Sequence, residues 1–458
     1  MNSLIVTLHL ILGALIVLMD VLQNRGKGIT FLRAFNAVFF LIFVLTPIYV
    51  QTVGLPTLMN VTGLFYSRPL SDQYYVYAAL YCALGYISVN GGYHMFAMRG
   101  AGQRTRDAIV QGMPVKRSLA FAAIGLTIVG LASLVLFVQE LGGMDRFWAT
   151  ILFKRTGNLM DLTPNAFLIS LAPLTLAGAT LFQVLWLYEK SGDKRAIYAT
   201  AFGATALLAS VVQVYSAGRL QFLMTISVFP IIYLMSRGKS LLLPTLIAIP
   251  IATVFIASGR DFFLAFNPEI RPSGDVFSYS TFEVVDRTAA EFSFPIMTLA
   301  NTIEYVPEKA EYRYFEDVPL AILYLVPTSY RPFSLPDTLA QINTDLTPGA
   351  TGGVPVDLVS YGIYNGGLLG LFITCSLFGI LLKYSDRRLA AANDPLVMAL
   401  RVSWLMGLAF YTAYANPVNF VRDFFYLFVL TVVLAIIPSR GGLRGRRSAE
   451  VSSQATAA

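Results

Sequence analysis

The chain has 458 residues, of which 56% are hydrophobic and only 13% are charged, and its mean hydropathy is +0.64. Because soluble proteins carry about 25% charged residues, this composition excludes an ordinary soluble domain and predicts an all-α polytopic membrane protein. Two cysteines and two histidines are too few for a disulfide framework or a histidine-rich metal site, so we expect no metal and no cofactor.

Eight apolar segments of membrane-crossing length, about 20 residues each, precede residue 259. We predict transmembrane helices at Leu4–Val21, Ala34–Val53, Tyr74–Met95, Ser118–Val138, Phe167–Trp186, Ala196–Val212, Leu220–Met235 and Leu241–Ala257. The first segment has no basic start and no small-residue cleavage site, so it is expected to be a retained helix and not a removed signal. Residues 1–258 are therefore predicted to form one transmembrane unit.

Residues 259–357 form the one long polar stretch, which we expect to fold as a loop with interfacial helices. The loop is rich in Phe and Tyr, an aromatic content that a disordered linker does not carry. Helical spacing over Glu283–Tyr305, interrupted at Pro295, predicts helices there, and the apolar segment Val318–Pro327 is too short to span. A long loop of this kind is usually functional, so we expect the working surface here.

Three more transmembrane helices are predicted within residues 358–438, at Leu358–Leu382, Val397–Tyr414 and Phe424–Ile437, which makes eleven in all. If the N-terminus is outside, the loops that lie inside and the basic tail, residues 439–458, hold most of the 33 Lys and Arg residues. This topology explains the net charge of +7 without a nucleic-acid partner. The simplest placement is a bacterial inner membrane, with the N-terminus and the long loop periplasmic and the C-terminus cytoplasmic.

Three arginines are predicted at the outer ends of helices, namely Arg219, Arg260 and Arg422. The last two each begin the tetrapeptide Arg-Asp-Phe-Phe, with Asp261 and Asp423 as the acids. Arginine presents a rigid, permanently charged fork that binds phosphate in a bidentate manner, so three arginines at one depth suit a diphosphate held near the lipid headgroups. The alternative is that each anchors its helix at the interface and pairs with a neighbouring aspartate.

These features resemble those of the Wzy-type oligosaccharide repeat-unit polymerases, also called O-antigen polymerases. The resemblance rests on Arg219 and Arg260, on the single large loop, and on the segments of residues 327–332 (PTSYRP) and 352–370 (GGVPVDLVSYGIYNGGLLG). It implies a GT-C-like membrane glycosyltransferase that uses polyprenyl-diphosphate-linked sugars at the periplasmic face, with a chain-length regulator and a flippase as possible partner proteins. The related O-antigen ligases carry a periplasmic histidine, which this chain lacks.

A glycosyl acceptor needs a carboxylate to take its proton, and Asp357 is the first candidate because it lies at the outer mouth of a predicted helix. The competing interpretation is that Asp357 caps the helix that starts at Leu358. Asp261 and Asp423 can instead orient the arginines beside them. Further candidates for supporting roles are Arg331 and Tyr361, and Glu283 and Glu291 remain possible bases in the loop.

Two other classes of function stay open. A flippase or another transporter of lipid-linked oligosaccharides would also be polytopic and basic, but it should show paired helical repeats or charges in the middle of its spans. A non-catalytic anchoring protein would not need the three arginines. The sequence therefore favours a metal-independent polymerase over a transporter, a ligase or an anchor.

Overall fold

The computed structural model describes residues 1–24, 28–54, 72–95, 116–151, 163, 165–216, 218–267, 280–327, 330–331, 333–347, 353–389 and 394–437. Throughout these ranges the regular structure is helical, and no strand occurs in them. The predicted basic tail, residues 439–458, lies outside the described residues.

The helices are described in three groups along the chain, which follow the predicted units. The first unit contains α1 (Asn2–Asn24), α2 (Phe31–Phe40), the π-helix η1 (Leu41–Leu45), α3 (Thr46–Val53), α5 (Gln73–Met95), α7 (Lys116–Leu141), α8 (Met144–Ala149), α10 (Leu168–Leu171), α11 (Leu174–Tyr188), α12 (Gly192–Tyr215), α13 (Arg219–Ser236) and α14 (Leu242–Leu264). The loop contains α15 (Thr281–Glu291), α16 (Phe294–Tyr305), α17 (Asp317–Leu323) and α18 (Leu339–Asp345). The last unit contains α19 (Leu358–Tyr364), α20 (Gly367–Arg388), α21 (Pro395–Ala413), α22 (Pro417–Asp423) and α23 (Phe425–Ile436).

The described helices identify a multi-pass membrane protein. Nine helical segments in these ranges are long and apolar enough to cross a membrane, and α22 with α23, bent by 64°, forms a tenth if the pair is counted as one span. The helix α5 has the length of a crossing, at 23 residues, but its tyrosines and glycines leave it less apolar than the nine. The prediction of many crossing helices is therefore confirmed, while the expected number of eleven is not reached by these criteria.

Two predicted boundaries differ in the structure. The helix expected at Leu358–Leu382 is split into α19 and α20, because Gly366 and Gly367 take positive φ angles of 145° and 63° that break the helix. The span accordingly starts at Gly367. Conversely, α14 continues to Leu264, so Arg260 and Asp261 lie in a helix and not in the loop.

The helices α5 and α20 pack closely against each other. A Cβ atom on Gly92 would lie 2.0 Å from the carbonyl oxygen of Ser376, and one on Gly379 would lie 2.0 Å from that of Val89. Only glycine permits this approach of two backbones, as in many membrane helix pairs. The close packing fixes the helices beneath the loop.

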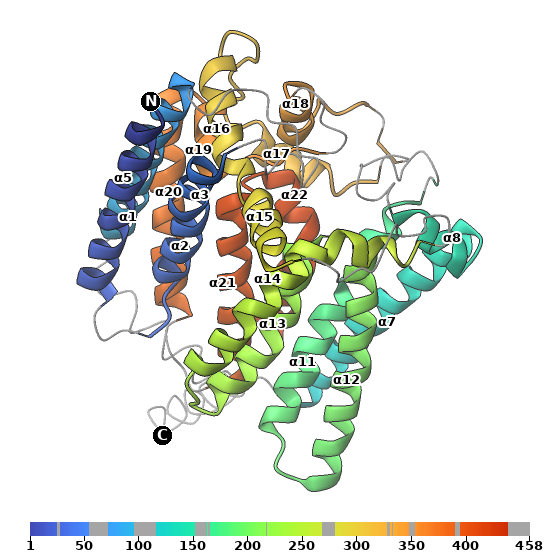
Figure 1. Ribbon diagram of the computed structural model, residues 1–458. Helices are drawn as coiled ribbons and strands as arrows, with labels where there is room; N and C mark the ends of the chain where they lie inside the picture. Colours follow the sequence, from blue (N-terminus) through green and yellow to red (C-terminus); the bar gives the residue numbers. More distant parts are fainter. Residues whose placement is uncertain are drawn as a thin grey trace, which may run out of the picture.

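Figure 1 shows how the helices surround α21. The helices α1, α2, α5 and α20 lie on one side, α7, α11 and α12 on the other, and α13 and α14 lie towards the front. The loop helices α16, α17 and α18 gather at the end of the bundle where the N-terminus lies. The expectation that the N-terminus and the long loop lie on the same side of a membrane stays a prediction.

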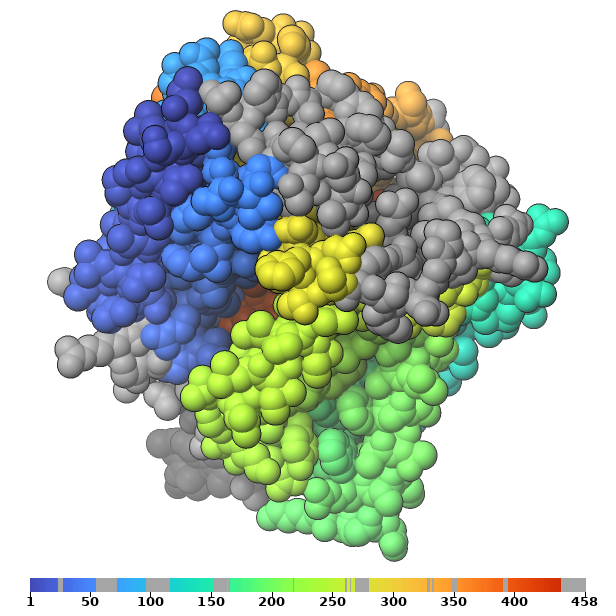
Figure 2. Space-filling model, in the orientation of Figure 1, coloured from blue at the N-terminus to red at the C-terminus, as the bar shows by residue number. Residues whose placement is uncertain are grey.

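The helix α15 lies between the two sides. It packs on α14 and also contacts α3, so it joins the first helices of the chain to the α13 and α14 pair. Figure 2 shows a hollow between the surface of α2 and α3 and that of α13, in which α21 is visible, and α15 lies over one end of this hollow.

Candidate functional site

Arg219 is the first residue of α13, and its side chain lies at the junction of α13, α14 and α15. Its Nη1 donates a hydrogen bond to the carbonyl oxygen of Ile256 at 3.0 Å, and its Nη2 forms an ion pair with Glu291. The side chain crosses Gly259, where a Cβ would lie 2.7 Å from the Arg219 Cγ and Cδ atoms. Arg219 is therefore held in a fixed position, with only 11% of its side chain exposed.

The partner of Arg219 comes from α15, whose position is set by its own capping. Ser280 and Glu283 form a reciprocal capping box that starts the helix. The hydrogen bonds that Glu283 accepts from the Ser280 backbone N–H and hydroxyl lower the pKa of its carboxyl. Of the two loop glutamates considered as bases, Glu283 is thus a cap and Glu291 is the ion-pair partner of Arg219.

Arg260 and Asp261 lie in the last turns of α14, and their side chains are outside the described part of the structure. The phenylalanines that follow them are described. Phe263 is buried and packs with Phe222 and Phe255 in a cluster of rings. The structure therefore brings the Arg219 side chain to Gly259, the residue directly before Arg260.

Arg422 lies in the last turn of α22, and its Nε is 3.2 Å from the carboxylate of Asp423. The two side chains are 47% and 27% exposed. Within the described ranges, no hydrogen bond or ion pair joins the Arg422–Asp423 pair to the Arg219–Glu291 pair. This arrangement fits the interpretation of Arg422 as an interface anchor paired with its neighbour, and it leaves the guanidinium accessible.

Asp357 is the N-cap of α19, as one of the two interpretations of the sequence predicts. Its carboxylate accepts hydrogen bonds from the backbone N–H of Val359 at 2.8 Å and of Ser360 at 3.1 Å, and from the Ser360 hydroxyl. Burial raises its pKa to about 6, although these hydrogen bonds act in the opposite direction. The group thus has a proton affinity suited to a general base near neutral pH, but its side chain is fully buried.

The supporting candidates Tyr361 and Arg331 contact different residues of the loop. Tyr361 is buried on α19, with its ring edge-on to Phe315 at 6.5 Å between centroids. Arg331 donates from Nε to the carbonyl oxygen of Val326 at 2.7 Å and lies over the ring of Tyr324. Both side chains contact loop residues, and the burial of Tyr361 leaves little of its ring accessible to a ligand.

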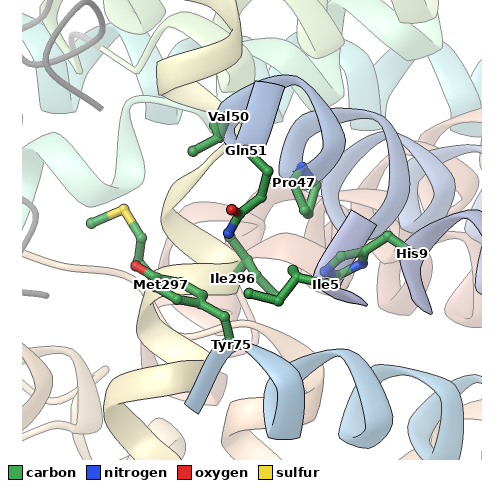
Figure 3. A pocket seen from close by; sticks show the side chains of 8 residues that line it. All are labelled: Ile5, His9, Pro47, Val50, Gln51, Tyr75, Ile296 and Met297. Atoms are coloured by element: carbon green, nitrogen blue, oxygen red, sulfur yellow. The ribbon is translucent and has the colours of Figure 1, made fainter. Parts of the chain in front are cut away.

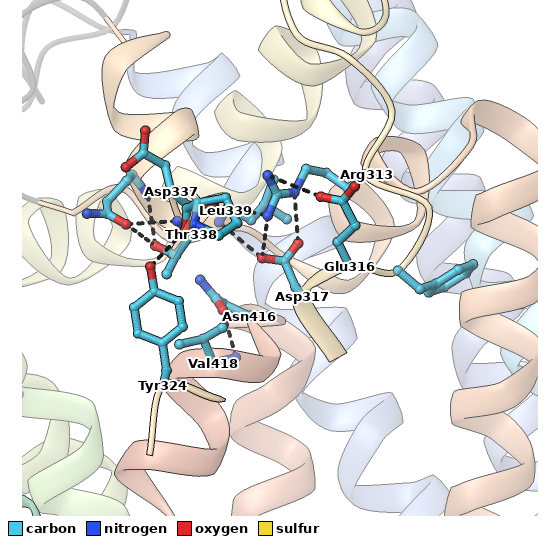
Figure 4. Close-up of polar contacts among 12 residues, drawn as sticks. Arg313, Glu316, Asp317, Tyr324, Asp337, Thr338, Leu339, Asn416 and Val418 are labelled. Carbon is cyan, nitrogen blue, oxygen red and sulfur yellow. Dashed lines mark hydrogen bonds and ion pairs between the residues drawn. The ribbon is translucent and has the colours of Figure 1, made fainter. Parts of the chain in front are cut away.

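A buried ion pair that the sequence analysis missed organises the loop. Arg313 donates from Nε and Nη2 to the two carboxylate oxygens of Asp317 at 3.2 and 3.1 Å, and also to the carbonyl oxygen of Asp337. Asp317 in turn accepts from the backbone N–H of Leu339 (Figure 4). Arg313 precedes α17, and Tyr314 and Phe315 between the two partners have positive φ angles of 46° and 66°, so the i,i+4 pattern of a helix does not predict this pair.

A small cavity lies between α1, α3, α5 and α16 (Figure 3). Its lining is mainly apolar, with His9 and Gln51 among the polar side chains. The His9 Nδ1 is 2.6 Å from the carbonyl oxygen of Phe43 in η1. None of the candidate site residues lines this cavity.

Comparison of the chain with protein-family models, with curated proteins and with solved structures found no match. The resemblance to the repeat-unit polymerases therefore stays a prediction. Among the described residues, no group of three or more His, Cys, Asp or Glu side chains is arranged to hold a metal ion. The site consists of one fixed, nearly buried arginine with a carboxylate partner, near the loop end of the bundle.

Proposed function

We propose that the protein polymerises polyprenyl-diphosphate-linked oligosaccharide repeat units at the periplasmic face of a bacterial inner membrane. The growing glycan is transferred from its lipid diphosphate to the incoming unit, without a metal. The observation that carries this proposal is the position of Arg219, which is fixed by Ile256 and Gly259 and presents its guanidinium to a carboxylate. A guanidinium that binds a carboxylate also matches a phosphate.

The proposed reaction requires stabilisation of the charge on the leaving diphosphate and removal of the proton from the acceptor hydroxyl. The acceptor hydroxyl attacks the anomeric carbon of the donor sugar, the bond from that carbon to the diphosphate oxygen breaks, and the polyprenyl diphosphate leaves with the electron pair. Arg219 stabilises the negative charge that develops on this leaving group, since fixed donors that need no reorganisation are effective there. Arg260 and Arg422 are proposed to contribute further positive charge.

The proton of the acceptor hydroxyl passes to a carboxylate. Asp357 has the required proton affinity, with a pKa raised to about 6, but it acts as a base only if the start of α19 becomes accessible. Asp423 is already accessible and lies beside Arg422. Asp357 stays the first candidate and Asp423 the second, with Asp261 as a further possibility.

The proposal includes the topology and the partners. The N-terminus and loop lie in the periplasm, the C-terminus in the cytoplasm, and a flippase supplies the lipid-linked units while a chain-length regulator limits the polymer. A ligase or a flippase remains the alternative class. The lipid-linked intermediates distinguish them, since loss of a polymerase leaves single repeat units outside, whereas loss of a flippase leaves them inside.

The test is the substitution Arg219→Lys, which keeps the charge and removes the bidentate fork. We expect polymer ladders to fall about a hundredfold at unchanged protein level, with single lipid-linked units accumulating at the outer face. The matched control is Arg237→Lys, because Arg237 caps the other end of the same helix and is exposed. Normal ladders in Arg219→Lys would refute the assignment of the diphosphate to Arg219.

A further inference from the structure

The helix α15 is held by three polar contacts, each to a different helix. Tyr49 on α3 donates a hydrogen bond to Asp286, and the Thr288 hydroxyl donates to the carbonyl oxygen of Thr253 on α14 at 3.1 Å. The third contact is the ion pair of Glu291 with Arg219 on α13. Because α15 has only 11 residues, these contacts carry much of its attachment to the bundle.

The apolar part of this attachment is small. Ala290 is fully buried and packs against Val50 of α3, and these two form a separate cluster with Tyr49 alongside. The first turn of α15, formed by Thr281, Phe282 and Glu283, is exposed. A short helix with few buried apolar contacts belongs to the part of a fold that opens at low cost.

The two partners of the ion pair differ in their access to solvent. The Arg219 side chain is 11% exposed and is also bound to Ile256, whereas the Glu291 side chain is 32% exposed. If the pair separates, Glu291 can turn to water and Arg219 cannot. Glu291 is therefore the exchangeable partner, and the guanidinium stays in place for another anion.

We propose that α15 is a lid over the Arg219 site, and that Glu291 stays bound to the Arg219 guanidinium until a diphosphate displaces the Glu291 carboxylate. The identity of this ligand rests on the proposed function. The helix α15 lies over one end of the hollow in which α21 is visible (Figure 2), and its last residue, Glu291, pairs with Arg219. A diphosphate competes because it offers more charge and more acceptor oxygens than one carboxylate.

If α15 is a lid, the buried contact between Ala290 and Val50 should open to solvent when the ion pair of Glu291 with Arg219 is lost. The reporter is Ala290→Cys in a chain whose Cys82 and Cys375 are replaced by alanine, and the measurement is its labelling rate with a water-soluble maleimide in detergent. We expect Glu291→Gln to raise this rate about fivefold, the effect of losing an ion pair of about 1 kcal/mol. Inorganic pyrophosphate should raise it similarly in the chain with Glu291 intact.

The controls separate opening of α15 from general loosening and from salt effects. Ala300→Cys on α16 is equally buried and should stay unreactive throughout, and sodium sulfate at equal ionic strength should not reproduce the effect of pyrophosphate. Val50→Cys reports the same contact from α3, in case Ala290→Cys does not fold. Arg219→Ala should raise the basal rate and remove the response to pyrophosphate.

Labelling that is unchanged by Glu291→Gln, or that rises equally at Ala300→Cys, would overturn the lid, as would a lack of response to pyrophosphate. The outcome is independent of the polymer assay. A lid that responds to pyrophosphate in a protein whose deletion leaves the polymer ladders intact would leave the lid standing and remove the proposed function.

Discussion

Substitution of Gly259 by alanine tests the Arg219 site without touching a charged residue. An alanine Cβ would lie 2.7 Å from the Cγ and Cδ atoms of Arg219, which is closer than carbon atoms approach one another. These atoms are in the middle of the side chain, and its far end is bound to Ile256 and Glu291. The arginine must therefore shift, and both contacts of its guanidinium are lost or lengthened.

The two effects of this substitution on stability nearly cancel. Alanine is favoured over glycine within a helix by about 1 kcal/mol, while overpacking costs about 1–3 kcal/mol. A net loss of about 2 kcal/mol or less leaves the protein folded. In contrast, displacement of a positioning group by about 1 Å costs about a hundredfold in rate.

The assay for Gly259→Ala is the polymer ladder, normalised to the amount of protein in the membrane. The matched control is Gly203→Ala in α12, where a Cβ would meet nothing within 4 Å, so we expect normal ladders there. If Gly259→Ala supports normal polymer formation, Arg219 does not need its observed position, and the fixed-guanidinium argument is refuted.

Three further predictions address other residues. Asp357→Asn retains the cap and removes the base, so it abolishes the ladder if Asp357 is catalytic and leaves it intact if Asp357 only caps. Burial raises the pKa of Asp357 from 3.8 to about 6, so the folded state binds this proton more tightly than the unfolded state. The stability of the wild type, measured by thermal unfolding, should therefore fall as pH rises through this interval. The stability of Asp357→Asn should not show this fall. Asp317→Asn should destabilise the loop by about 3 kcal/mol, because it leaves Arg313 buried without the carboxylate of Asp317. The measurement is the resistance of the loop to protease. The control Glu316→Gln removes a more exposed contact to Arg313, at 3.8 Å, and should have little effect. Cysteines at Ser280 or Gln341 should label from outside the cell and those at Asp193 or Ser385 only after permeabilisation, and the reverse pattern would contradict the proposed topology.

The positions of the crossing helices could be predicted because length and apolar character alone determine them. The division of α19 from α20 could not, since Gly366 and Gly367 break the helix only in the conformation that the loop imposes, with Phe315 donating its backbone N–H to the side chain of Asn365 at 2.5 Å. In the sequence, residues 358–382 form one largely apolar segment, which predicts a single helix. Local polarity therefore predicts the span and misses the tertiary contact that ends it.

For the site, the residues that act through their own neighbours were predictable, and those that act across the chain were not. The Asp357 cap is a local pattern, and so is the pairing of Arg422 with Asp423. The pairing of Arg219 with Glu291 joins residues 72 positions apart and depends on where α15 packs. A single sequence contains no signal for such a pair.

A comparison of Arg313 with Arg219 shows how a structural arginine differs from one that is available to a ligand. Arg313 is satisfied by Asp317, which is fully buried and also holds the backbone of Leu339, so separating the pair would leave a carboxylate without solvent and a helix without its cap contact. Arg219 is bound to one carbonyl oxygen and to Glu291, which can reach water. Exchange of its partner therefore costs one partly exposed ion pair of about 1 kcal/mol, whereas exchange at Arg313 costs several times more, and this difference favours Arg219 over Arg313 as the binding site of the proposed anionic ligand.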